Sequence, residues 1–135
     1  MFNRNRNAVV CAHDEDTSKL IFRMQETFFN NLPDFLRPMK RRASVGELVF
    51  DKPSEAGRIT SPGLNSRVQI RTAGGAGRKA GLGQGSAGVG RGDRIDLFHG
   101  SEIAFWPNGH EVFRGFAQAV PEAPGTAILL ESTAN

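Results

Sequence analysis

Cysteine and histidine are scarce in this chain of 135 residues, which has one Cys and three His. A single cysteine cannot form an internal disulfide, and this fits the reducing environment of the cytoplasm. One Cys and three scattered His also do not make the ligand cluster that a zinc site needs. Cys11 lies in a short apolar run and is expected to be a small buried hydrophobe.

Long apolar runs are missing as well. No stretch approaches the roughly 20 apolar residues that a membrane-spanning helix requires, so we expect no membrane partner. The first residues, Met1 to Asn7, lack the apolar core of a signal peptide. These absences favour a protein of the cytoplasm, and the length allows at most one domain of ordinary size.

The sequence also lacks the Gly-Lys-Ser or Gly-Lys-Thr of a phosphate-binding P-loop. Residues 74–92 contain nine of the 16 glycines, and the substrings 75–80 and 83–88 match dinucleotide-binding patterns literally. We reject both matches, because that motif needs a helix directly after it and here more glycine comes next. The segment is then either a flexible Gly-rich loop or a mobile basic loop that reaches DNA or a neighbouring subunit's nucleotide.

The formal charge of +3 is too small to demand a nucleic-acid partner by itself. Positive side chains gather in two stretches of the sequence, which are Arg37 with Lys40, Arg41 and Arg42, and Arg78 with Lys79, Arg91 and Arg94. Each stretch either tracks phosphates or forms a solvated face or loop.

The hydrophobic pattern predicts alternating strands and helices. Expected elements are strands at 8–12, 47–51, 67–71, in the run after Asp93, and at 127–130, with helices at 17–31 and 110–120. Leu20, Met24 and Phe28, continued by Leu32, form the apolar face of the first helix. The strand–helix order favours an α/β fold with a parallel sheet, into which 47–51 and 67–71 insert a β-hairpin. The basic stretch 39–44 is expected at the surface.

One carboxylate stands at a position suited to chemistry. The strand after Asp93 runs into Ser101 and Glu102, and open α/β sheets bind their ligands at the carboxyl ends of strands. Glu102 is therefore the candidate to orient and deprotonate a water molecule, although a carboxylate there can also simply cap a turn. Asp96 lies too early in the strand to reach the same end, and it is expected to be paired at the sheet's edge or to face a helix terminus.

The same residues carry a resemblance to a known family. The segment Ser101 to Pro107, with the sequence SEIAFWP, resembles the Walker B segment and the residues directly after it in the large terminase subunit of tailed bacteriophages. That subunit is the ATPase of the DNA-packaging motor. The last residues, Leu130 to Asn135, resemble the family's coupling motif, and Gln118 to Pro121 fits the intervening sequence. The resemblance covers nearly the whole chain.

The resemblance implies a P-loop NTPase-like fold and a role for each matching residue. Glu102 would activate water, while Ser132 and Thr133 would couple hydrolysis to DNA movement. Ser101 stands where the family usually has an Asp that holds the metal through water. A hydroxyl there can still accept a hydrogen bond from a metal-bound water, but it adds no negative charge. Arg91 is the candidate for an arginine finger that acts on a neighbouring subunit, and Arg94 competes for that role.

The resemblance also implies the ligands and partners of the intact motor. These are ATP and Mg²⁺, double-stranded DNA, the small terminase subunit and the portal, with the ATPase assembled as a homo-oligomeric ring in the bacterial host's cytoplasm. Because the P-loop strand and helix are missing, residues 1–135 are expected to be an internal part of the ATPase domain, inactive alone. Its incomplete sheet would have an uncovered edge and tend to self-associate.

A second hypothesis remains open from the sequence. A small non-enzymatic nucleic-acid-binding protein could grip phosphates with the basic Gly/Arg-rich loop and the basic cluster.

Overall fold

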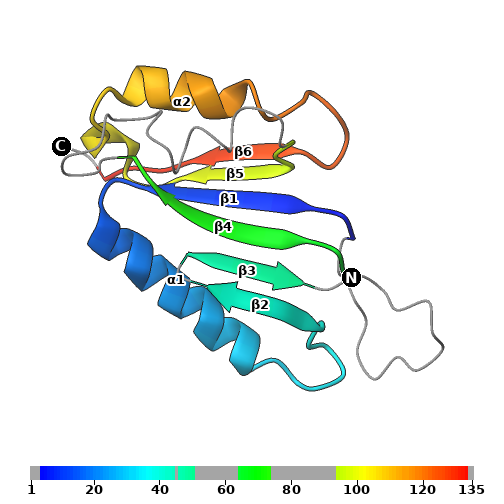
Figure 1. Cartoon of the computed structure of the whole chain (residues 1–135). Helices are drawn as coiled ribbons and strands as arrows, with labels where there is room; N and C mark the ends of the chain where they lie inside the picture. The colour runs from blue at the N-terminus through cyan, green and yellow to red at the C-terminus, as the bar shows by residue number, and fades with distance from the viewer. Residues whose placement is uncertain (1–3, 45, 51–63, 74–93, 134–135) are drawn as a thin grey trace.

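The computed structural model describes residues 4–44, 46–50, 64–73 and 94–133, which form a six-stranded sheet with two α-helices. In chain order the elements are β1 (Asn7–Ala12), α1 (Glu15–Asn30), β2 (Lys40–Ser44), β3 (Glu47–Phe50), β4 (Arg67–Thr72), β5 (Leu97–Gly100), the short 3-10 helix η1 (Ile103–Phe105), α2 (Gly109–Ala117) and β6 (Ala127–Leu130). The strands lie in the order β2-β3-β4-β1-β5-β6 (Figure 1). The predicted α/β class is therefore confirmed.

The sheet is mixed. β4, β1, β5 and β6 run parallel to one another, whereas β2 and β3 are joined to the sheet by antiparallel pairs. The expected hairpin is present as the antiparallel β3–β4 pair, but β4 is also a parallel neighbour of β1 and so belongs to the main sheet. The basic stretch that we expected at the surface forms an edge strand, β2.

The two helices cover opposite faces of the sheet, with α2 above it and α1 below it in Figure 1. Val112 and Phe116 of α2 pack against Val9 and Phe98 in the main core. Phe98 is fully buried, and its ring stacks on Phe116 at a centroid distance of 4.6 Å. Side chains alternate along a strand, so the neighbours of Val9 in β1 face the side of α1.

Cys11 lies in the main core beside Val9 and is fully buried. Burial raises the pKa of its thiol to about 12, so the side chain is neutral at physiological pH. A neutral, buried thiol is neither a nucleophile nor a metal ligand. Cys11 is thus the small buried hydrophobe that the sequence predicts.

Helix α1 begins at Glu15, two residues before the predicted start, and faces a different way. Asp14 caps it, since the carboxylate accepts the N–H of Thr17 at 2.7 Å. The expected apolar face was wrong, because Leu20, Met24 and Phe28 are 57%, 50% and 70% exposed. The face that is buried instead carries Ser18 and Phe29: the Ser18 hydroxyl lies 2.8 Å from the Thr72 hydroxyl of β4, and the Phe29 ring centroid lies 5.7 Å from that of Phe50 in β3.

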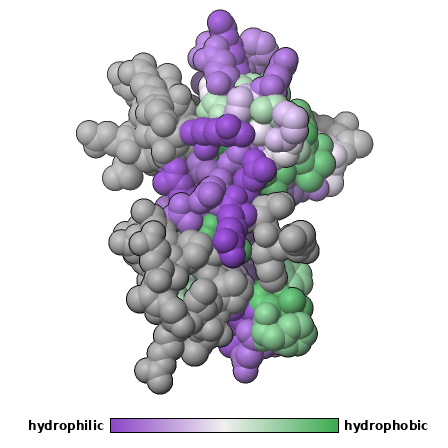
Figure 2. All heavy atoms as spheres, turned by 90° about the vertical axis from the view of Figure 1, so that its right-hand side faces the viewer, coloured by the Kyte–Doolittle hydropathy of each residue, from purple (hydrophilic) through white to green (hydrophobic). Residues whose placement is uncertain are grey.

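Asp96 ties together the amino ends of the central strands. Its carboxylate is buried, accepts the N–H of Asn7 at 3.0 Å, and pairs with Arg6 and Arg94 at 2.9 and 3.1 Å. Burial acts to raise the pKa of Asp96, but these hydrogen bonds and charges outweigh it and hold the pKa below its ordinary value. The expectation that Asp96 is paired is confirmed. Figure 2 faces this end of the strands, and its middle is largely hydrophilic.

Candidate functional site at the carboxyl ends of β5 and β6

The parallel strands β1, β5 and β6 end at one edge of the sheet, and polar residues come after each of them. Glu102 comes two residues after β5, and Thr133 comes three residues after β6. The Glu102 carboxylate accepts two hydrogen bonds from Thr133, from the N–H at 3.1 Å and from the hydroxyl at 2.9 Å. Both bonds end at Oε2, which leaves Oε1 without a hydrogen bond from any described residue. The carboxyl ends of these strands therefore hold a fixed carboxylate whose Oε1 can accept a further hydrogen bond.

The hydrogen bonds set the charge of this carboxylate. The N–H and then the hydroxyl of Thr133 lower the pKa of Glu102 below its ordinary value. Glu102 is therefore ionised at neutral pH and remains an acceptor until the solution is distinctly acidic.

Several backbone contacts fix the segment that carries Glu102. The Ser101 N–H donates to the Cys11 carbonyl at 2.8 Å, and the Trp106 indole N–H donates to the Ser101 carbonyl at 2.9 Å. Gly100 leaves room for this packing, because a Cβ there would lie 3.0 Å from the Trp106 ring and 3.1 Å from both Ile103 and Leu130 side chains. The apolar block after Glu102 thus closes over the end of β5 and anchors the turn.

Glu102 itself adopts a left-handed backbone conformation, with φ 55° and ψ 47°. The other described non-glycine residues with positive φ are asparagines, at positions 5, 65 and 108, and asparagine tolerates this region. For glutamate the conformation is strained, and such strain gathers at functional sites. A glutamate held here at a cost to backbone energy supports a role for its side chain.

This strain gives a testable difference between two substitutions. Glu102→Gly and Glu102→Ala both remove the carboxylate, but only glycine adopts the left-handed backbone freely. We expect Glu102→Gly to melt at a Tm about 3–5 °C above that of Glu102→Ala in thermal unfolding followed by circular dichroism. Equal Tm values, or a more stable Glu102→Ala, would contradict the assigned backbone geometry.

The two residues of the coupling motif make different contacts. Thr133 binds Glu102, whereas the Ser132 hydroxyl accepts the N–H of Ala104 at 3.2 Å and so supports η1. The η1 turn is also joined to the end of β6 by the Ile103 N–H, which donates to the Glu131 carbonyl at 3.2 Å. Thr133 is therefore the residue that links the strand end to the carboxylate.

The remaining predicted residues lie elsewhere or outside the description. Ser101 is buried directly before Glu102 and is held through its backbone. Arg94 pairs with Asp96 at the amino end of the sheet, which is the end opposite to Glu102, so it does not join the site of its own chain. Arg91 and the Gly-rich segment lie outside the described residues.

The oxygen atoms of this edge do not by themselves fit a resident magnesium ion. Around Glu102 they comprise its own carboxylate and the hydroxyls of Thr133 and Ser132, while Ser101 is buried and the Glu131 carboxylate contacts His99. Magnesium prefers near-octahedral oxygen coordination, which this set does not provide. Across the described ranges there is no group of three or more His, Cys, Asp or Glu that could hold a metal.

The sequence reasoning missed His13 as a neighbour of the site. His13 comes directly after β1, contacts the Asp14 carboxylate through Nε2, and has its ring centroid 6.0 Å from that of Phe105. Its Nδ1 is buried and has no hydrogen-bond partner among the described residues. The signal that could have found it is the one that found Glu102, namely a polar residue directly after a buried parallel strand.

No protein-family model matches the chain, and no curated protein matches it. None of the helices in the described ranges is long and apolar enough to cross a membrane.

Proposed function

We propose that this chain is the part of a nucleotide-hydrolysing motor domain that carries the water-activating carboxylate and the coupling residue. The motor would be of the kind formed by large terminase subunits, and the substrate would be ATP with Mg²⁺. The observation that supports this proposal is the pair of hydrogen bonds from Thr133 to Glu102. They join the Walker B-like and coupling-like motifs across two adjacent parallel strands, 31 residues apart in sequence.

In the proposed reaction Glu102 orients the attacking water through its free oxygen, Oε1. Phosphoryl transfer needs in-line placement of the nucleophile and stabilisation of charge more than a strong base. A carboxylate with a lowered pKa suits this task, because it stays ionised and accepts a hydrogen bond from water. The triphosphate itself would be held by a phosphate-binding loop, which also brings the magnesium ion on its phosphates.

Coupling depends on the same hydrogen bonds. A bound nucleotide whose attacking water takes a hydrogen bond to Glu102 would draw the carboxylate away and weaken its bonds to Thr133. The segment after β6 would then be released, and Ser132 would pass the change to η1. The bonds from Thr133 thus give a physical route from nucleotide state to the backbone beyond β6.

The partners in this proposal are those of a packaging motor: double-stranded DNA, a small terminase subunit, a portal, and further copies in a ring within the host cytoplasm. Arg91 would act on the nucleotide of a neighbouring copy. The rival hypothesis, a non-enzymatic nucleic-acid-binding protein, depends mainly on residues outside the description. The Glu102–Thr133 contact gives no reason to prefer it.

The test is to compare the chain alone with a fusion that adds a strand, a Gly-Lys-Thr phosphate-binding loop and a helix before Met1. We expect magnesium-dependent phosphate release from the fusion. From the 135-residue chain we expect none above the level of its Glu102→Ala variant, because its sequence has no Gly-Lys-Ser or Gly-Lys-Thr loop to cradle a triphosphate. Robust, Glu102-dependent hydrolysis by the unfused chain would contradict the proposal.

A further inference from the structure

The outer edge of β6 is open within the part of the chain that the structure describes. β6 pairs with β5 on one side only, and the strand order places it at the end of the sheet. Its four residues are Ala127 and then three large apolar residues, Ile128, Leu129 and Leu130, which are 41%, 56% and 40% exposed. An apolar, uncharged strand at an edge readily pairs with another strand.

The other edge of the sheet is built differently. β2 begins with the sequence Lys-Arg-Arg, and its pairing with β3 shifts register between Lys40 and Arg42. Positive charges and an irregular register both discourage edge-to-edge pairing. The contrast singles out β6 as the edge that a partner strand would use.

We propose that β6 pairs antiparallel with β6 of a second copy of this chain, about a two-fold axis that passes Leu129. The Ala127 N–H donates to the Asp96 carbonyl and the Glu131 N–H donates to the Gly100 carbonyl, so these odd-numbered residues direct their backbone toward β5. Alternate residues of a parallel strand face opposite neighbours, which leaves the backbone groups of Ile128 and Leu130 on the open side. Ile128 of each copy then pairs with Leu130 of the other, and these two pairs satisfy the outward N–H and carbonyl groups of both residues.

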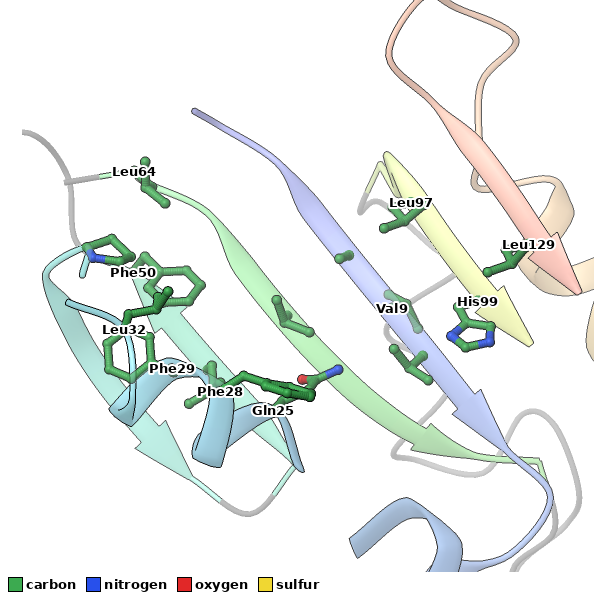
Figure 3. Close-up of a pocket in the computed structure, with 15 residues that line it drawn as sticks. Val9, Gln25, Phe28, Phe29, Leu32, Phe50, Leu64, Leu97, His99 and Leu129 are labelled. Carbon is green, nitrogen blue, oxygen red and sulfur yellow. The ribbon is translucent and has the colours of Figure 1, made fainter. Parts of the chain in front are cut away.

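The side chains agree with this register. The sheet face toward α1 has a hollow of about 500 Å³, with residues of α1 on its far side (Figure 3). Leu129 lines this hollow together with Leu97 and His99 of β5. Ile128 and Leu130 point to the other face, where Leu130 lies against Gly100. A two-fold axis perpendicular to the sheet places the same face of both copies on the same side of the joined sheet. Leu129 therefore meets Leu129, and Ile128 meets Leu130, so only apolar side chains are joined.

Charges at the two ends of β6 are complementary. The Arg6 guanidinium lies at the amino end, with Nη2 2.7 Å from the position of a Cβ on Gly125. Glu131 lies at the carboxyl end, 58% exposed and 3.2 Å from His99 Nε2. Antiparallel pairing sets Glu131 of the second copy opposite Ala127, near Arg6. The parallel alternative would place like charges together. Because the paired segment is short, we expect a concentration-dependent dimer rather than an obligate one.

The first experiment is sedimentation of the 135-residue protein over a range of concentrations. We expect the mass to rise from monomer toward dimer and to stop there. Ile128→Pro removes an outward N–H without touching the pairing to β5, and it should stay monomeric, whereas Ala43→Lys on the opposite edge should dimerise as the parent does. A parent that stays monomeric, a mass that grows beyond dimer, or equal dimerisation of Ile128→Pro and the parent would overturn the proposal.

A second experiment tests the register directly. Opposed residues at a non-hydrogen-bonded antiparallel position have Cα atoms about 4.5 Å apart, which suits a disulfide. Leu129→Cys should therefore give a covalent dimer under mild oxidation, since Cys11 is buried and does not compete. Ala127→Cys is the matched control, because its two copies would lie roughly 13 Å apart along the strands. No cross-linking of Leu129→Cys, or equal cross-linking of the two variants, would overturn the register.

Discussion

Phe98→Ala is expected to lower the free energy of unfolding by about 3–5 kcal/mol, a large part of the stability of a domain this size. Phe98 is fully buried on β5, stacks on Phe116, and meets the Trp106 ring edge-on at a centroid distance of 6.4 Å. Removing the ring leaves a cavity between the sheet and α2, and neither can move far enough to fill it. Urea unfolding followed by circular dichroism measures the loss.

Two controls separate this effect from a general sensitivity to substitution. Phe35→Ala removes the same ring from a side chain that is 79% exposed, and it should change the free energy of unfolding by no more than about 0.5 kcal/mol. Phe98→Leu keeps most of the apolar volume and should fall between the two. If Phe98→Ala proves as mild as Phe35→Ala, the core does not form around β5 as described.

Local patterns were enough to predict most of the elements. β6 lies at the predicted residues, and β1 and α2 lie within a few residues of theirs, because each has a clear apolar period bounded by polar or turn residues. The residues of β4 were also predicted, but its place in the sheet, between β3 and β1, could not be. Its alternating pattern indicates an antiparallel strand, which it is toward β3, but the parallel contact with β1 depends on partners 60 residues away.

The orientation of α1 differs from its apolar stripe, because the face that packs on the sheet carries Ser18 and Phe29. The spacing of Leu20, Met24 and Phe28 predicts that they face the core. Ser18 instead sits against β4, where its hydroxyl meets Thr72 and the Arg71 carbonyl. No periodicity argument reports a hydroxyl pair between residues 54 positions apart.

The candidate site was predictable in part. That Glu102 comes after the buried strand, and that Thr133 comes after the last one, can be read from the sequence. Their contact could not be, because it needs β5 and β6 to be neighbours in register. The left-handed backbone at Glu102 could not be predicted from the residue type either, because glutamate rarely adopts this conformation.

Glu102→Gln is expected to abolish turnover while preserving nucleotide binding in the fusion that carries the phosphate-binding loop. The amide keeps the shape of the side chain and can still contact Thr133, but it cannot accept a proton and orients water poorly. Loss of a positioned general base lowers rates by about 10²–10⁴-fold. Glu131→Gln is the matched control, because Glu131 is a carboxylate at the same edge, one residue beyond β6, and is exposed.

The most direct test of the central claim is the rate of phosphate release by this fusion and by its Glu102→Gln and Glu131→Gln variants, each at saturating magnesium–ATP with affinity measured in parallel. We expect equal affinities, parent-like turnover for Glu131→Gln, and turnover of Glu102→Gln reduced by at least about 10²-fold. Comparable turnover in the parent and Glu102→Gln, with nucleotide bound equally well, would contradict the assignment of Glu102 as the residue that activates water.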